Sequence, residues 1–142
     1  KGCLMAYASG VGLSRMAYEK IEAGAETVLR EMAPADGHRF TGELIAEAAN
    51  QGDEVAGEIL RVAGYYGGIG LSLIIQILNP EVIVLGGGLT HIGARLVDPM
   101  MEGMRENTQP ELWDSVRIVP WQLGNDLGIL GAAAKVFADA EG

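Results

Sequence analysis

The sequence predicts an α/β domain that is rich in helices and has few strands. Two segments, residues 82–85 and 116–120, have the composition of short strands, and stretches with apolar residues at helical spacing precede, separate and follow them. The resulting order is helices, strand, helix, strand, helix, which is typical of an α/β layer. Two strands are too few for a complete doubly wound domain.

The helix boundaries are predicted from capping residues and from apolar spacing. Thr41 is a candidate N-cap for a helix over residues 42–50, and Asp53 for a long helix over residues 54–78. Residues 4–22 have helical spacing that Gly10 and Gly12 interrupt, which predicts two short helices.

The remaining segments complete this order. Residues 33–40 are expected to form a loop, and residues 89–107 a helix that kinks or restarts at Pro99. A last helix is expected over residues 127–140, with Asp126 as its candidate cap.

The first strand runs directly into three glycines. Val82 to Leu85 show no polar alternation, which indicates a strand covered on both faces. Gly86, Gly87 and Gly88 follow its carboxyl end, where α/β sheets bind ligands, and glycine lets a ligand or another backbone approach closely. Both a site for an anion or nucleotide and a tight turn without a ligand fit this pattern. A dinucleotide fingerprint fits poorly, because His91 stands where that motif needs glycine or alanine.

Composition excludes several classes of partner. The 10 basic and 19 acidic residues give a net charge of −9, which repels phosphate backbones and anionic membranes, so we expect no nucleic-acid partner. Cys3 is the one cysteine, so no internal disulfide can form, which suits a reducing cytoplasm. No signal peptide is visible, and a cytoplasmic location is expected.

One segment resembles a membrane span by composition. Residues 62–80 carry no charge, and Gly64 and Gly68 have the spacing of a small-residue helix contact. The segment also contains further glycines and polar side chains and leads directly into the strand. We therefore expect a buried helix, with no membrane partner, whose glycines allow close packing.

Three segments in the correct order resemble the ROK family (repressors, open reading frames, sugar kinases). Residues 1–10 resemble the end of its signature, Cys-x-Cys-Gly-x-x-Gly-Cys-x-Glu-x-x-x-Ser-Gly, with Gly2, Cys3, Ser9 and Gly10 in register. Residues 79–88 resemble its adenosine segment and residues 123–133 its carboxyl-terminal segment. Among members, the chain looks most like the bacterial glucokinases.

The resemblance implies a partial ribonuclease-H-like fold of the actin/hexokinase/Hsp70 superfamily. Residues 1–142 would form its carboxyl-terminal domain alone, with the amino-terminal domain absent. In such kinases, the absent part carries the general-base aspartate and an Asp-x-Gly-Gly-Thr loop that grips phosphate. We therefore expect no catalytic residue in this chain.

The resemblance also implies a function. The intact parent would transfer a phosphoryl group from ATP, with Mg²⁺, to glucose, and Gly86 to Gly88 would form half of the nucleotide site. The chain alone is expected to be inactive and to form a homo-oligomer through exposed apolar surface and the glycine-rich helix of residues 64–70. The alternatives are the sugar-sensing domain of a ROK repressor and a non-enzymatic self-associating fragment.

Two positions depart from the family pattern. Cys3 matches the last of three cysteines that hold a structural zinc with a histidine, and one thiolate cannot supply four ligands, so a free thiol without zinc is expected. Met5 stands where the family has a sugar-binding glutamate, and a thioether is a poor acceptor for sugar hydroxyls. Met5 is interpreted either as core filling or as a substitution in a substrate-binding position.

Overall fold

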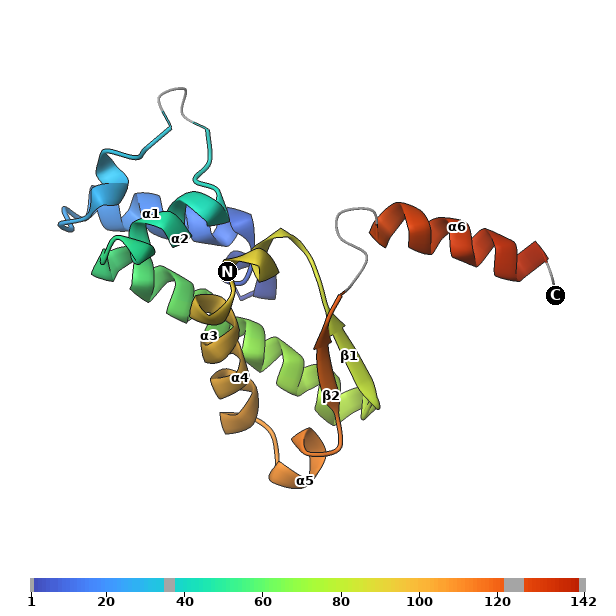
Figure 1. Cartoon of the computed structure of the whole chain (residues 1–142). Helices are drawn as coiled ribbons and strands as arrows, with labels where there is room; N and C mark the ends of the chain where they lie inside the picture. Colours follow the sequence, from blue (N-terminus) through green and yellow to red (C-terminus); the bar gives the residue numbers. More distant parts are fainter. Residues whose placement is uncertain (1, 35–37, 122–126, 141–142) are drawn as a thin grey trace.

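The computed structural model describes residues 2–34, 38–121 and 127–140, and it has helices packed against a small sheet (Figure 1). The α-helices are α1 (Gly10–Glu22), α2 (Gly42–Asn50), α3 (Glu54–Leu78), α4 (Ala94–Glu106), α5 (Pro110–Trp113) and α6 (Leu127–Ala140). The strands are β1 (Val82–Leu85) and β2 (Arg117–Pro120), and short 3₁₀ helices are η1 (Leu4–Ala6), η2 (Val28–Arg30) and η3 (Gly88–Ile92).

The two strands form a parallel sheet. Val82 pairs with Arg117, and the register continues to Leu85 opposite Pro120. The connection from β1 to β2 runs through η3, α4 and α5, as parallel strands require a long crossover.

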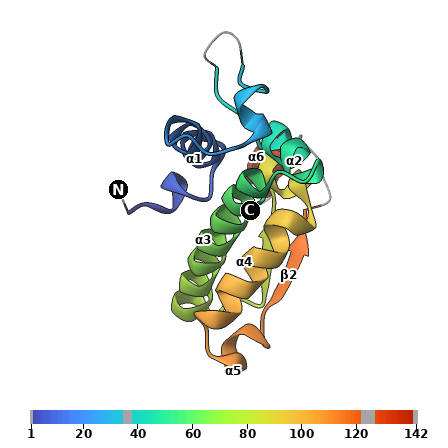
Figure 2. The ribbon, with the colours of Figure 1, turned by 90° about the vertical axis from the view of Figure 1, so that its left-hand side faces the viewer.

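The long helix α3 lies at the centre and contacts α4 along its length (Figure 2). Glycine makes this contact close: a Cβ at Gly64 would overlap the carbonyl oxygen of Leu96, and one at Gly68 that of Met100. Conversely, a Cβ at Gly103 of α4 would overlap the carbonyl oxygen of Tyr65. The glycines of α3 therefore serve packing within the chain, and they give no support to the prediction that they join two copies.

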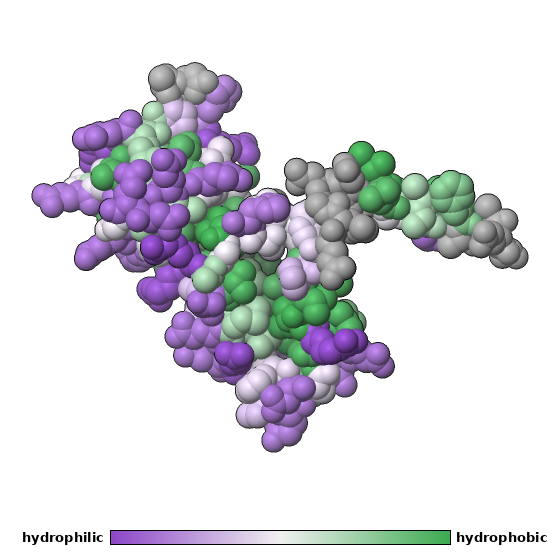
Figure 3. All heavy atoms as spheres, viewed as in Figure 1, coloured by the Kyte–Doolittle hydropathy of each residue, from purple (hydrophilic) through white to green (hydrophobic). Residues whose placement is uncertain are grey.

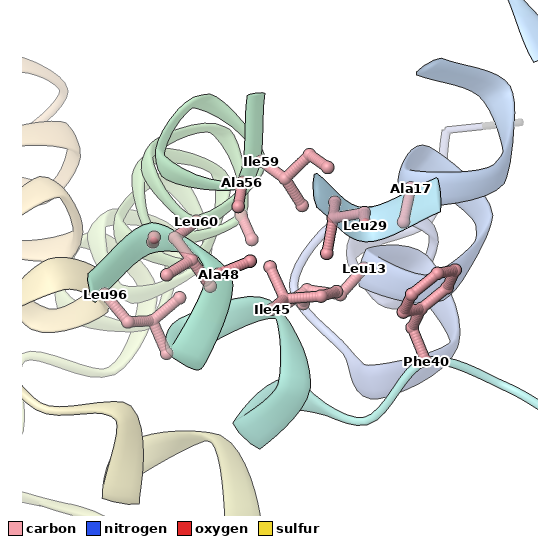
Figure 4. Packing of buried hydrophobic residues seen from close by; sticks show 12 residues of the cluster. Leu13, Ala17, Leu29, Phe40, Ile45, Ala48, Ala56, Ile59, Leu60 and Leu96 are labelled. Atoms are coloured by element: carbon pink, nitrogen blue, oxygen red, sulfur yellow. The ribbon is translucent and has the colours of Figure 1, made fainter. Parts of the chain in front are cut away.

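The interior consists of two clusters of buried apolar side chains. The larger cluster joins α1, α2 and α3 and includes Leu13, Phe40, Ile45 and Leu60 (Figure 4). The smaller cluster joins the end of α3 to α4 and the sheet, and its buried members are Leu71, Ile75 and Met104.

Most of the predicted boundaries are confirmed. The hydroxyl of Thr41 accepts from the backbone N–H of Leu44, and the carboxylate of Asp53 accepts from that of Ala56, so both residues cap their helices. The last helix has the predicted bounds, while its candidate cap Asp126 lies outside the described residues.

Two local predictions were wrong. The break after the glycines lies at Gly93, which has φ +75°, and Pro99 lies inside α4 with its ring near Gly64 of α3. Gly10 and Gly12 lie inside α1, and the interruption before it falls at residues 7–9. Gly12 is required there because a Cβ would come within 2.7 Å of the carbonyl oxygen of Ala6.

The prediction that the first strand is covered on both faces was also wrong for this chain. Ile83 and Leu85 pack on the smaller cluster, but Val82 and Val84 on the opposite face are 37% and 57% exposed. A continuous apolar run indicates only that both faces of a strand are apolar. Which residues cover each face depends on the rest of the fold.

Within the described residues, α3 is long and apolar enough to cross a membrane by length and composition. Half of its most apolar stretch is buried inside the molecule, against α1, α2 and α4. It therefore packs as a core helix, as the sequence predicted.

The last helix, α6, lies apart from the other elements (Figure 1). Its apolar side chains are exposed, with Ile129 at 74% and Phe137 at 70%. A helix of this composition has apolar surface available for packing that the described chain does not use.

Asp53 holds the start of α3 against η2. Its carboxylate accepts hydrogen bonds from the backbone of Ala56 and Val28 at 2.7 Å and from the hydroxyl of Thr27 at 2.8 Å. Partial burial alone would raise the pKa of Asp53, but these hydrogen bonds outweigh it and keep the pKa below its ordinary value of 3.8.

Replacing Asp53 should destabilise the chain in a pH-dependent way. We expect Asp53→Ala to reduce the free energy of unfolding by about 1–2 kcal/mol at pH 7, the usual cost of losing a helix cap. Because the folded-state pKa is lowered, this contribution is present above the unfolded pKa and is lost as pH falls through the folded pKa. Urea unfolding between pH 7 and pH 3 measures the difference, with Asp53→Asn as the uncharged control. A difference that stays constant with pH would contradict this role for the charge.

Candidate functional site

The three glycines have different roles in the structure. A Cβ at Gly86 would overlap the ring of Trp121, which follows β2, so this residue must be small for the sheet end to pack. Gly87 has φ +111°, a conformation that side chains with a Cβ rarely adopt, and its carbonyl oxygen accepts from the hydroxyl of Thr90 at 2.7 Å. The positions at Gly87 and Gly88 are open, because a Cβ at either would meet nothing within 4 Å.

Gly87 and Gly88 line a cavity of about 330 Å³ between the end of β1 and the start of α1. Its other side is formed by Ala8, Ser9 and Gly10, so the fold joins the opening motif to the glycine segment. The hydroxyl of Ser9 is used locally, accepting from Gly12 and donating to the carbonyl oxygen of Met5. Both segments stand out in the sequence, but no local pattern indicates that they meet, because the contact depends on how α1 packs on α3.

The cavity offers backbone and apolar groups to a ligand. Among the described residues that line it, none has a charged side chain. Such a cavity can accept the part of a nucleotide that lies against the protein backbone. The phosphate charge and a Mg²⁺ ion would need ligands from outside its lining.

A second hollow of about 490 Å³ lies on the other side of η3, against α2. Its lining has apolar side chains from Ala46 and Ile92 and polar side chains from Glu43, Glu47, Asn50, Gln51 and His91. Arg95 donates from Nε to the amide oxygen of Asn50 at 2.7 Å, which fixes that amide. This hollow was not predicted from the sequence, because a polar stripe on a helix is usually a solvated face.

Met5 does not line either cavity. It lies in η1 with 67% of its surface exposed, so the interpretation of Met5 as core filling is wrong for this chain.

Cys3 is an exposed free thiol. In the described parts of the chain, no group of three or more histidine, cysteine, aspartate or glutamate side chains lies close enough to hold a metal ion. Cys3 can supply one of the four ligands that such a zinc site needs.

A further groove of about 390 Å³ lies between α1 and α3. Its charged side chains pair with each other, Arg15 with Glu19 at 2.5 Å and Lys20 with Glu58 at 2.7 Å. The ring of Tyr7 is stacked on that of Tyr66 at a centroid distance of 4.2 Å. Lys20 and Glu58 join α1 to α3, whereas Arg15 and Glu19 pair within α1, and these pairs leave few polar groups of the groove free for a ligand.

Comparison with known proteins identifies relatives over almost the whole chain. A sequence model of the ROK family matches residues 1–138. A glucokinase of Streptomyces coelicolor is 32% identical over 136 residues, which are 94% of this chain and 43% of that protein. The DNA-binding transcriptional repressor Mlc of Escherichia coli is 24% identical over 93% of this chain and 31% of that protein.

A solved structure has the same fold. The ROK family glucokinase from Streptomyces griseus, crystallised with glucose and AMPPNP, superposes with a TM-score of 0.76 and 31% identity, over 94% of this chain and 44% of that chain. The predicted sugar-kinase fold of the actin/hexokinase type is thus confirmed. The chain spans less than half the length of the curated relatives it matches.

Proposed function

The chain belongs to the ROK family, and on that premise we propose that it is the carboxyl-terminal portion of an ATP-dependent glucokinase. The observation that carries this proposal is the open position at Gly87 and Gly88 on a cavity at the carboxyl end of β1. In parallel α/β sheets this end of the strands is the usual place for a ligand.

In this proposal the two hollows beside η3 bind different parts of the nucleotide. Gly87 and Gly88 would let the ribose and phosphate region approach the backbone, since no Cβ stands in its way. The hollow against α2 would hold the base, because Asn50, Gln51 and Glu47 supply amide and carboxylate groups that can pair with ring nitrogens and an exocyclic amine.

The chemical step needs groups that this portion does not supply. Phosphoryl transfer depends on gripping the phosphates, on a metal ion and on a residue that orients the attacking hydroxyl. When bound, Mg²⁺ would neutralise charge on the phosphates, and its ligands would come from the remainder of the polypeptide. The isolated chain should therefore bind nucleotide weakly and phosphorylate no sugar.

Two other functions are compatible with family membership. A sugar-sensing domain of a repressor is the first, because the Escherichia coli repressor Mlc matches 93% of this chain. The open glycine positions favour the kinase, since a sensor of sugar has no need for a nucleotide cavity. The second is a non-enzymatic fragment that self-associates through exposed apolar side chains, such as those of Leu73 and Ile77 on α3.

Self-association, a cytoplasmic location and the absence of nucleic-acid and membrane partners are part of the proposal. They are supported by the exposed apolar surface, by the net charge of −9 and by the packing of α3 as a core helix. A homo-oligomer of the isolated chain would form through apolar faces that the remainder of the polypeptide covers.

Nucleotide binding should depend on Gly88. We expect Gly88→Val to weaken the affinity for AMPPNP at least tenfold, about 1.4 kcal/mol, because a branched side chain would fill the open position. Titration calorimetry at millimolar nucleotide measures this affinity. Gly87 is a poorer test position, since its φ of +111° would strain any other residue.

The matched control for this test is Gly57→Val. It places the same side chain in open space on α3, outside the lining of both hollows, and should leave the affinity unchanged. A folded Gly88→Val variant with unchanged affinity would show that the glycines form only a turn.

Sugar binding should improve with Met5→Glu in a complex completed by the remaining part of the Streptomyces coelicolor glucokinase. A charged acceptor forms hydrogen bonds worth about 1.5–3 kcal/mol each, so one gained bond means roughly a tenfold rise in glucose affinity. Met5→Gln, which has an acceptor without charge, should gain less. The melting temperature of the isolated chain should change little, because Met5 is 67% exposed. No gain in glucose affinity with either variant, in a complex that forms normally, would reject the substrate-binding assignment of Met5.

A further inference from the structure

The side-chain amide of Asn50 is held in one orientation by Arg95. Asn50 is the last residue of α2, which lies beside the start of α4, where Arg95 stands (Figure 2). Nε of Arg95 donates to Oδ1 of Asn50 at 2.7 Å. A guanidinium group has donors and no acceptor, so the amide oxygen must face Arg95. The amide nitrogen, Nδ2, is then the donor that Asn50 offers to another partner.

Asn50 lines the hollow against α2, whereas Arg95 lies outside its lining. Arg95 therefore acts on a ligand in this hollow through the amide that it holds. Two carboxylates of the lining, those of Glu43 and Glu47, lie on the same face of α2 as Asn50, because residues three, four and seven apart share a helix face. Figure 3 shows mainly hydrophilic residues over the part of the molecule where α2 lies. The hollow thus combines a donor of fixed direction with groups that accept hydrogen bonds.

Apolar side chains of η3 pack closely against α2 beside these polar groups. Ile92 of η3 and Ala46 of α2 are the apolar members of the lining. Gly42, the first residue of α2, allows the close approach, because a Cβ there would lie 2.8 Å from the side chain of Leu89 and 3.1 Å from that of Ile92. A flat aromatic base can lie against such apolar side chains while its edge reaches the polar groups.

The direction of the Asn50 amide decides how a base can bind. Adenine has an exocyclic amine, which donates, and two ring nitrogens beside it, N1 and N7, which accept hydrogen bonds. The amine can donate to a carboxylate while one of these nitrogens accepts from Nδ2. With the amide reversed, its oxygen would face the ring nitrogen, so two acceptors would oppose each other and the hydrogen bond would be lost. The contact with Arg95 disfavours that reversed orientation.

We propose that Arg95 is a positioning residue for the base of an adenine nucleotide, and that it holds the amide of Asn50 so that Nδ2 donates to a ring nitrogen. Arg95 has this role only if the proposed nucleotide site exists, and the role deepens that proposal by naming how the base is recognised. A held amide also lowers the entropy cost of binding, because one side chain of the site is already ordered.

The test compares ATP with 1-deaza-ATP and 7-deaza-ATP, each of which lacks one of the two ring nitrogens. Titrations of the isotopically labelled chain at millimolar nucleotide, followed by amide chemical shifts, measure the three affinities. We expect one analogue to bind about three- to tenfold more weakly than ATP, the usual effect of losing one neutral hydrogen bond. That analogue identifies the nitrogen that accepts from Nδ2.

Replacing Arg95 should remove this selectivity. In Arg95→Met, whose side chain has no donor, the affinity ratio between ATP and the weaker analogue should fall to near one, because the amide of Asn50 is free to turn. Arg95→Lys should keep most of the ratio, since an ammonium group also donates without accepting. If Arg95 served packing alone, or attracted phosphate by its charge, its loss would weaken all three nucleotides equally and leave the ratio unchanged.

The matched control for charge is Arg61→Met. It removes an exposed arginine of α3 that lies outside the lining of the hollow, and it should leave the ratio as it is in the unmodified chain.

A second measurement needs no nucleotide. The side-chain amide of Asn50 should be well ordered in the unmodified chain, and its nitrogen order parameter should fall below about 0.6 in Arg95→Met. The side-chain amide of Asn107, which donates to the carbonyl oxygen of Gly103 at 2.8 Å, serves as the internal reference and should keep its order in both. A spectrum of the backbone amides checks that each variant is folded.

Three results would overturn this role of Arg95. The first is equal affinity of the unmodified chain for ATP and both analogues, with shifts at Gly88 that show binding. The second is a ratio that a folded Arg95→Met variant leaves unchanged. The third is a mobile Asn50 amide in the unmodified chain. If none of the three nucleotides shifts Gly88, the proposed nucleotide site itself is rejected, and the role of Arg95 with it.

Discussion

The close contact between α3 and α4 positions the rest of this structure. It depends on glycine on both helices, because side chains at Gly64, Gly68 or Gly103 would overlap the backbone of the opposite helix. With the axes held together, Leu71 and Ile75 of α3 and Met104 of α4 form one surface on which Ile83, Leu85 and Ile118 of the strands can pack. The end of β1, and with it the glycine segment, is thereby fixed beside the start of α1. The glycines of α3, which contribute to its resemblance to a membrane span, are thus explained by the close packing that they allow.

The glycine segment serves structure and proposed function at different residues. Gly86 is demanded by Trp121 and Gly87 by its backbone conformation, and both requirements exist without any ligand. Gly88 has an ordinary conformation and open space, so neither packing nor backbone conformation requires glycine at that position. The tight-turn interpretation is thus supported at Gly86 and Gly87, and the ligand site stays a prediction.

How much could be predicted from the sequence depended on how local each feature is. The caps at Thr41 and Asp53, the strand at Val82 to Leu85 and the bounds of α6 follow from residues within one or two turns of each other, and they were predicted correctly. Features that depend on contacts between distant residues were not predicted. The open outer face of β1, the place of Pro99 inside α4 and the meeting of Ser9 with Gly87 depend on tertiary packing, which no local pattern reports. Family resemblance supplied the fold, but the exposure of Met5 could be seen only in the structure.

The proposed function depends on nucleotide binding in the cavity between the end of β1 and the start of α1. A titration of the isotopically labelled chain with AMPPNP, followed by amide chemical shifts, tests it most directly. We expect shifts that grow with nucleotide concentration at Gly87, Gly88 and Thr90 and at Ala8 to Gly10, with smaller ones at Asn50 and Gln51. Shifts confined to the groove between α1 and α3, or none at millimolar nucleotide, would contradict it.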